Sequence, residues 1–92
     1  KIAVPEDCRE YPPFQVKSHH LDTNHHVNNG QYILMAMEYL PAGFEVKEMR
    51  AEYKNQAVLG SVIVPKVHEQ DSIYTVVLDS PSGETFAVVE LK

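Results

Sequence analysis

The segment from Tyr32 to Leu40 constrains the fold most, because it predicts a helix with almost no polar face. Ile33, Met37 and Leu40 recur at helical spacing and form one apolar stripe. Other apolar side chains cover much of the remaining surface, and Pro41 ends the helix. A helix that is apolar nearly all round is a buried helix. The rest of this 92-residue chain is therefore expected to wrap around it.

The two ends of this segment differ in character. Asn28 and Asn29 are both good N-cap residues, so we expect the helix to begin there. Near the other end, Glu38 is the one carboxylate on a mostly apolar cylinder. It either points outward at a rim or takes part in a pocket.

The rest of the chain predicts short strands with turns between them. The last two turns, Glu69–Ser72 and Ser80–Gly83, imply antiparallel hairpins. One helix can be buried only if the sheet curls about it, with a second copy covering any remaining surface. The predicted fold class is α+β, with one long buried helix wrapped by a curved antiparallel sheet of about five strands. These strands are expected at Phe14–His20, Phe44–Gln56, Ser61–His68, Ile73–Asp79 and Thr85–Leu91.

Composition excludes several classes of protein. Eight basic against thirteen acidic side chains give a net charge of −5, which argues against nucleic-acid binding. No apolar run is long enough to span a membrane. The lone Cys8 cannot form an internal disulfide, which fits a reducing compartment. Residues 1–13 hold three prolines and suit a linker or arm, or else a disordered terminus. Because the chain starts at Lys1 and not Met, we expect a piece of a longer protein.

The polar loop before the helix holds the candidate chemistry. Asp22, Asn24 and His26 would share one face of an ideal strand. On a straight strand Asp22 and His26 would lie about 13 Å apart, too far for a hydrogen bond. They therefore need a bend, separate contacts on a ligand, or partners from another strand.

These residue types suit the hydrolysis of an activated acyl group. His26 is suited to moving a proton near neutral pH, and the Asn24 amide orients a water or a carbonyl oxygen. The helix start at Asn28, Asn29 and Gly30 offers backbone N–H groups and the positive end of the dipole, which stabilise an oxyanion.

Other interpretations of the loop compete with catalysis. Four histidines (His19, His20, His25 and His26) suggest a metal site, but no HExxH pattern or cysteine pair accompanies them, so we predict no metal and no cofactor. Cys8 lies in the arm, away from the histidines, which argues against a cysteine nucleophile. In the plainest interpretation, the polar residues only cap and satisfy a turn.

The stretch from Asp22 to Tyr32 resembles the Asp-x-Asn-x-His-Val-Asn-Asn-x-x-Tyr signature of acyl-acyl carrier protein (acyl-ACP) thioesterases. The similarity continues at Ala36–Glu38 and Pro41, and again at Ala51–Lys54. The resemblance implies the hotdog fold, in two tandem copies with the signature in the second. Residues 14–92 would then be the C-terminal hotdog domain and residues 1–13 the interdomain linker.

The resemblance also implies roles. His26 would be the base or proton relay, Asn24 would position the thioester or water, and Asp22 would support Asn24 or the surrounding backbone. A family Glu on the strand after the helix falls on Gln56, which is a weak candidate because Gln cannot act as a general base but can hold a water.

By the same resemblance, the substrate would be a fatty acyl chain on acyl carrier protein, cleaved to free fatty acid during fatty acid biosynthesis in a bacterial cytoplasm. Partners would include an N-terminal hotdog domain or a second copy. Because acyl carrier protein is acidic, docking needs a basic patch, either here at Lys47, Arg50 and Lys54 or in the missing half.

Two alternatives follow from the same stretch. Its Asp-x-x-x-His-Val-Asn-Asn-x-x-Tyr core also looks like that of acyl-CoA thioesterases of the 4-hydroxybenzoyl-CoA type. If this chain follows those enzymes, Asp22 would be the base or nucleophile and His26 would be structural. The presence of Asn24 favours the carrier-protein family instead. The departure at Gln56 also leaves open a non-catalytic hotdog used for acyl binding or dimerisation.

Overall fold

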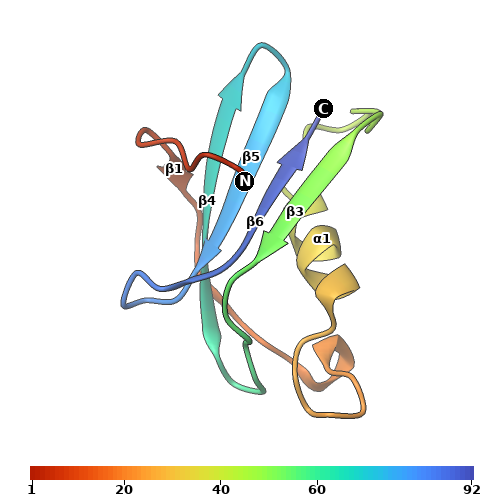
Figure 1. The fold of residues 1–92 in the computed structure, drawn as a ribbon, viewed down its shortest axis with the longest axis vertical. Coiled ribbons are helices and arrows are strands. Elements are labelled where there is room, and N and C mark those ends of the chain that lie inside the picture. The colour runs from red at the N-terminus through yellow and green to blue at the C-terminus, as the bar shows by residue number, and fades with distance from the viewer.

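The computed structural model describes residues 1–92 and has one six-stranded antiparallel sheet with a single α-helix, which confirms the α+β class (Figure 1). The helix α1 (Asn29–Met37) follows a short 3-10 helix, η1 (Ser18–His20). The strands are β1 (Arg9–Glu10), β2 (Phe14–Gln15), β3 (Met49–Tyr53), β4 (Val62–Gln70), β5 (Ile73–Asp79) and β6 (Thr85–Leu91). They lie in the order β1-β4-β5-β6-β3, and β2 also pairs with β4.

The hairpins form where turn residues predict them, with one change of boundary. β4 continues to Gln70, so the β4–β5 turn shrinks to Asp71 and Ser72. Both have positive φ, 54° and 63°, as a two-residue hairpin turn requires. The second turn is confirmed, since the N–H of Gly83 donates to the carbonyl of Ser80 at 3.0 Å.

The helix begins as expected but is shorter and less buried. The side chain of Asn28 caps it, and it ends at Met37 before a turn. Met35 is buried, whereas Leu34 and Met37 are 55% and 41% exposed. The prediction of a helix buried all round is therefore wrong for this chain by itself. The sheet lies on one side of α1 and leaves the other side uncovered (Figure 1).

Two predicted strands are shorter than expected. The first is limited to Phe14–Gln15, because His20 Nδ1 accepts the N–H of Lys17 at 2.9 Å and the chain turns into η1. The segment predicted as a strand from Phe44 onward is irregular before Met49. There the N–H groups of Lys47 and Glu48 both donate to the last carbonyl of the chain, at 2.7 Å.

The sheet is apolar on both faces. One face packs on α1 through alternating residues of β5 and β6, such as Val76 and Val89. The opposite face carries Val77 and Val88, which Ile2 covers with only 4% of its own surface exposed. The N-terminal segment thus crosses the sheet face opposite α1 before β1 pairs with β4 (Figure 1). The helices of this chain are too short or too polar to cross a membrane.

Candidate functional site

The loop between η1 and α1 folds back on itself. Leu21 and Val27 form a bridge, and the N–H of Asp22 donates to the carbonyl of His26 at 2.9 Å. His25 occupies the left-handed region with φ of 64°, which closes the turn. The chain therefore bends between Asp22 and His26, which is what brings these two residues together.

The Asp22 carboxylate holds the backbone of this loop. Its Oδ1 accepts the N–H of Asn24 at 2.9 Å and the N–H of His26 at 3.3 Å. The side chains of Asn24 and His26 make no hydrogen bonds, with Asn24 exposed and His26 half-buried. Asp22 thus fixes the loop backbone and leaves these two side chains free for a ligand.

A segment far along the chain anchors the loop from the other side. Val58 bridges to His26, and the carbonyl of Ala57 accepts the N–H of Val27 at 3.0 Å. Continuing this antiparallel register places the exposed Gln56 across from residue 28. The structure therefore brings Gln56, the weakest of the candidate site residues, close to the start of α1.

The helix ties this arrangement together through Tyr32. Its buried hydroxyl accepts the N–H of Ala57 at 2.9 Å. Burial raises the pKa of Tyr32, so the hydroxyl stays neutral. Ala57 itself carries no signal in the sequence for this contact. The sequence signal for this contact was a tyrosine in an otherwise apolar segment, because a buried tyrosine needs a partner for its hydroxyl.

At the helix N-terminus only one of the proposed oxyanion donors is free. Asn28 Oδ1 accepts the N–H of Gly30 at 2.8 Å, and the Asn28 carbonyl accepts the N–H of Gln31 at 2.9 Å. The N–H of Asn29 has no hydrogen-bond partner. A Cβ on residue 30 would lie 3.2 Å from Asn28 Oδ1, so glycine leaves room for the cap. The positive end of the helix therefore presents the N–H of Asn29.

The remaining candidates lie elsewhere or are already paired. No group of three His, Cys, Asp or Glu side chains could hold a metal ion. The Cys8 thiol donates to the Pro5 carbonyl at 3.4 Å, and burial raises its pKa, which disfavours the thiolate. In the expected basic patch, Arg50 pairs with Glu90 at 3.0 Å and Lys54 with Glu52 at 3.6 Å, whereas Lys47 makes no ion pair.

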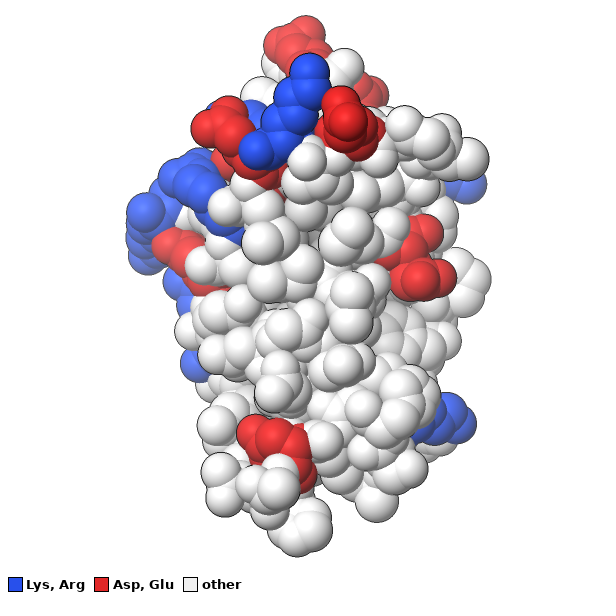
Figure 2. Space-filling view, turned by 90° about the vertical axis from the view of Figure 1, so that its right-hand side faces the viewer, with Lys and Arg blue, Asp and Glu red and all other residues white.

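The molecular surface around α1 carries little charge. Figure 2 shows this face, with most of its area uncharged and most Lys and Arg side chains gathered toward its upper end and edges. Leu34 and Met37 are exposed on α1. This face is therefore better suited to apolar contact than to electrostatic docking of an acidic protein.

Comparisons with known proteins agree on one family. Residues 5–91 match the family described as acyl-ACP thioesterase C-terminal domain. The fold is similar to an acyl-ACP thioesterase from Bacteroides thetaiotaomicron, with 16% identity and a TM-score of 0.82, covering 98% of this chain and 41% of that one. It is also similar to the 12:0-ACP thioesterase from Umbellularia californica, with 18% identity and a TM-score of 0.82, covering 100% of this chain and 38% of that one. No curated protein sequence matches. The chain thus spans about two-fifths of the solved proteins it resembles.

Proposed function

Because this chain belongs to the acyl-ACP thioesterase family, whose C-terminal domain it matches, we propose that it takes part in hydrolysing the thioester of fatty acyl-acyl carrier protein to free fatty acid. One observation carries the proposal of where this happens. The Asp22 carboxylate fixes two backbone N–H groups of the loop and leaves the side chains of Asn24 and His26 without hydrogen bonds, and the helix that follows the loop begins with the unpartnered N–H of Asn29.

The proposed reaction uses water as the nucleophile. The His26 imidazole takes a proton from water as the water oxygen attacks the thioester carbonyl carbon. The N–H of Asn29 and the positive end of the helix stabilise the oxyanion that forms. When the carbon–sulfur bond breaks, the proton on His26 goes to the leaving thiolate. Asn24 orients the water or the carbonyl oxygen, and Gln56 holds a water.

We also propose the hotdog architecture and a larger assembly around it. Residues 14–92 would form a C-terminal hotdog domain, with residues 1–13 as the linker from a preceding one. The uncovered side of α1, with Leu34 and Met37 exposed, supports a contact with that domain or with a second copy. Docking of acyl carrier protein would then use the preceding domain, since Arg50 and Lys54, two of the three residues of the expected basic patch, are paired here and leave only Lys47 free of an ion pair. The setting would be fatty acid biosynthesis in a bacterial cytoplasm.

Variants of the loop in the full-length protein test this function. With acyl-carrier-protein substrate, His26→Ala and Asn24→Ala should each lower kcat by about 100-fold or more. His25→Ala is the matched control, because its side chain is exposed and makes no hydrogen bond. Undiminished hydrolysis in His26→Ala would exclude it as the base. Binding of acyl ligand without turnover in the wild type would instead indicate a non-catalytic hotdog.

A second candidate function assigns the chemistry to Asp22, as in acyl-CoA thioesterases of the 4-hydroxybenzoyl-CoA type. One observation favours it: Asp22 Oδ2 makes no hydrogen bond and is free to act on a ligand. Asp22→Asn separates the two functions, because its amide oxygen can still accept the loop N–H groups but cannot act as base or nucleophile. Activity of Asp22→Asn within about tenfold of wild type supports the His26 mechanism. Complete loss of activity in Asp22→Asn, together with faster turnover of acyl-CoA than of acyl-carrier-protein substrate by the wild type, supports the alternative.

A further inference from the structure

The short helix η1 lies directly before the candidate loop, and its last residue, His20, is bonded through both its ring and its backbone. His20 Nδ1 accepts the N–H of Lys17 at 2.9 Å, and the His20 N–H donates to the carbonyl of Lys17 at 3.0 Å. The His20 carbonyl accepts the N–H of Asn28 at 3.1 Å. One histidine therefore connects the turn of η1 to the residue that caps α1.

The bond from Asn28 to His20 matters because Asn28 sets the start of α1. Asn28 Oδ1 accepts the N–H of Gly30 at 2.8 Å, and the Asn28 carbonyl accepts the N–H of Gln31 at 2.9 Å. The N–H of Asn29, which follows Asn28 directly, is the donor proposed for the oxyanion. An oxyanion donor is effective when its direction is fixed before the reaction. The direction of this N–H depends on Asn28, and Asn28 is held by the backbone of His20.

The neutral form of the His20 ring is required for this arrangement. A ring nitrogen can accept an N–H only when it carries no proton of its own. Burial, helped by the neighbouring His19 and Lys17, lowers the pKa of His20, so the ring is neutral at neutral pH. Protonation of Nδ1 would place two donors, the ring N–H and the Lys17 N–H, against each other.

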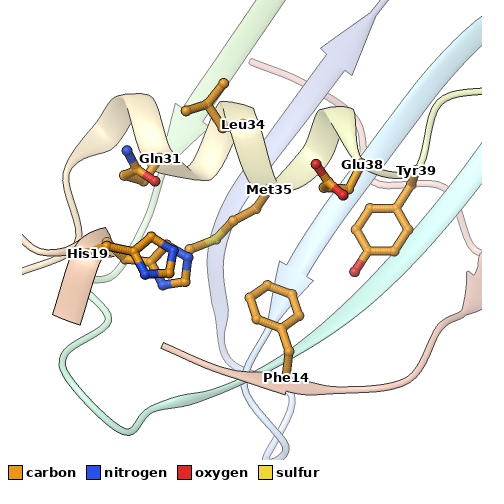
Figure 3. A pocket seen from close by; sticks show the side chains of 8 residues that line it. Phe14, His19, Gln31, Leu34, Met35, Glu38 and Tyr39 are labelled. Atoms are coloured by element: carbon orange, nitrogen blue, oxygen red, sulfur yellow. The ribbon is translucent and has the colours of Figure 1, made fainter. Parts of the chain in front are cut away.

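The surroundings of the ring offer it no other strong partner. His20 lines a groove of about 540 Å³ beside α1, and His19 packs on its ring with centroids 4.1 Å apart. Figure 3 shows His19 and Gln31 at one end of this groove and Glu38 and Tyr39 at the other. Glu38 carries the only carboxylate of the lining, and it lies at the end away from His19 (Figure 3). The remaining lining residues are apolar: Phe14, Leu34 and Met35.

We propose that His20 is a positioning residue for hydrolysis: its ring closes η1 on the Lys17 N–H, so that its carbonyl holds Asn28 and thereby fixes the direction of the Asn29 N–H. This role rests on the proposed function of the helix start. Loss of the ring acceptor should weaken the stabilisation of the oxyanion, which develops only in the transition state. It should therefore lower kcat and leave KM nearly unchanged.

Three variants of the full-length protein test the role of the acceptor. His20→Leu removes it, and His20→Gln replaces it with an amide oxygen that does not titrate. His19→Gln is the matched control, because His19 is the exposed neighbouring histidine and its ring makes no hydrogen bond. With acyl-carrier-protein substrate, His20→Leu should lower kcat about tenfold, and the other two variants less than about threefold.

Amide hydrogen exchange measures the positioning without relying on hydrolysis. The protection of the Asn28 amide should fall at least about tenfold in His20→Leu and stay within about threefold of wild type in His20→Gln and His19→Gln. In the wild type this protection should also fall between about pH 7.5 and pH 5, relative to the amides of β5, because the protonated ring cannot accept. His20→Gln should show no such relative change, since its amide does not titrate.

The outcomes separate this role from the proposed function. Unchanged protection of Asn28 in His20→Leu would overturn the proposal, and so would equal losses in His20→Leu and His20→Gln. Lost protection with unchanged kcat would overturn it as well, because the helix start would then have no part in the reaction. A wild type that hydrolyses no acyl substrate would overturn the proposed function, whereas lost protection in His20→Leu would in that case still support the hold of His20 on α1.

Discussion

Replacing Tyr32 with Phe tests whether the helix holds the candidate loop in place. Tyr32 is 1% exposed, and its hydroxyl accepts the N–H of the fully buried Ala57 at 2.9 Å. The carbonyl of Ala57 in turn accepts the N–H of Val27, next to His26. Phe keeps the ring and its packing but removes the acceptor. The Ala57 N–H is then left buried without a partner.

The expected loss follows from that one unsatisfied group. A buried N–H without an acceptor costs about 1–3 kcal/mol. Each kcal/mol lowers the melting temperature of a domain this size by about 4–8 °C. For Tyr32→Phe we therefore expect about 2 kcal/mol of lost stability and a decrease of about 8–16 °C.

Urea denaturation and amide hydrogen exchange measure this loss in two ways. The exchange of the Ala57 and Val27 amides should quicken more than that of the β5 and β6 amides, because the loop anchor is weakened locally. Tyr74→Phe is the control. Its ring packs edge-on against Phe44 at 5.2 Å and its hydroxyl makes no hydrogen bond, so it should cost less than about 0.5 kcal/mol. Equal losses in the two variants, or unchanged exchange at Ala57, would refute the argument.

Three further predictions concern the loop and the sheet. His25→Gly should raise stability by about 0.5–1 kcal/mol in urea denaturation without lowering hydrolysis, because glycine adopts the φ of 64° without strain. Asp22→Ala should lower stability by about 1–2 kcal/mol, and Asp22→Asn less, because alanine leaves two loop N–H groups without their acceptor. The hydrogen bond from Arg50 lowers the pKa of Glu90 below its ordinary value of 4.5. This pair therefore contributes to folding stability above pH 4.5, and the contribution is lost as the pH falls through the lowered pKa. Thermal melts from neutral pH to about pH 3 should therefore fall less steeply in Arg50→Met than in wild type.

The local parts of the fold could be predicted because their signals lie in adjacent residues. Asn28 caps α1 as its chemistry indicates. The hairpins of β4, β5 and β6 follow their turn residues. In the loop, Asp22 bonds N–H groups two and four residues ahead, a short-range pattern typical of aspartate.

The errors concern contacts that sequence spacing does not encode. The alternation at Phe14–His20 predicts a strand, but the side chain of His20 competes for the N–H of Lys17 and turns the chain. The bond from Ala57 to Tyr32 joins residues far apart in sequence, so the local pattern indicates that Tyr32 needs a partner but not that Ala57 is that partner. The same is true of Ile2, whose burial depends on a sheet face formed much later in the chain.

The apolar periodicity of residues 32–40 predicted that α1 is a helix, but it could not predict what covers the helix. Apolar periodicity reports that a side chain needs cover, but it does not say whether the cover comes from the same chain, another domain or a ligand. The sheet covers Tyr32, Met35 and Ala36. Leu34 remains exposed and forms part of the groove wall. The apolar pattern of α1 therefore indicates correctly that these side chains need cover, and the sheet supplies it for Tyr32, Met35 and Ala36 but not for Leu34.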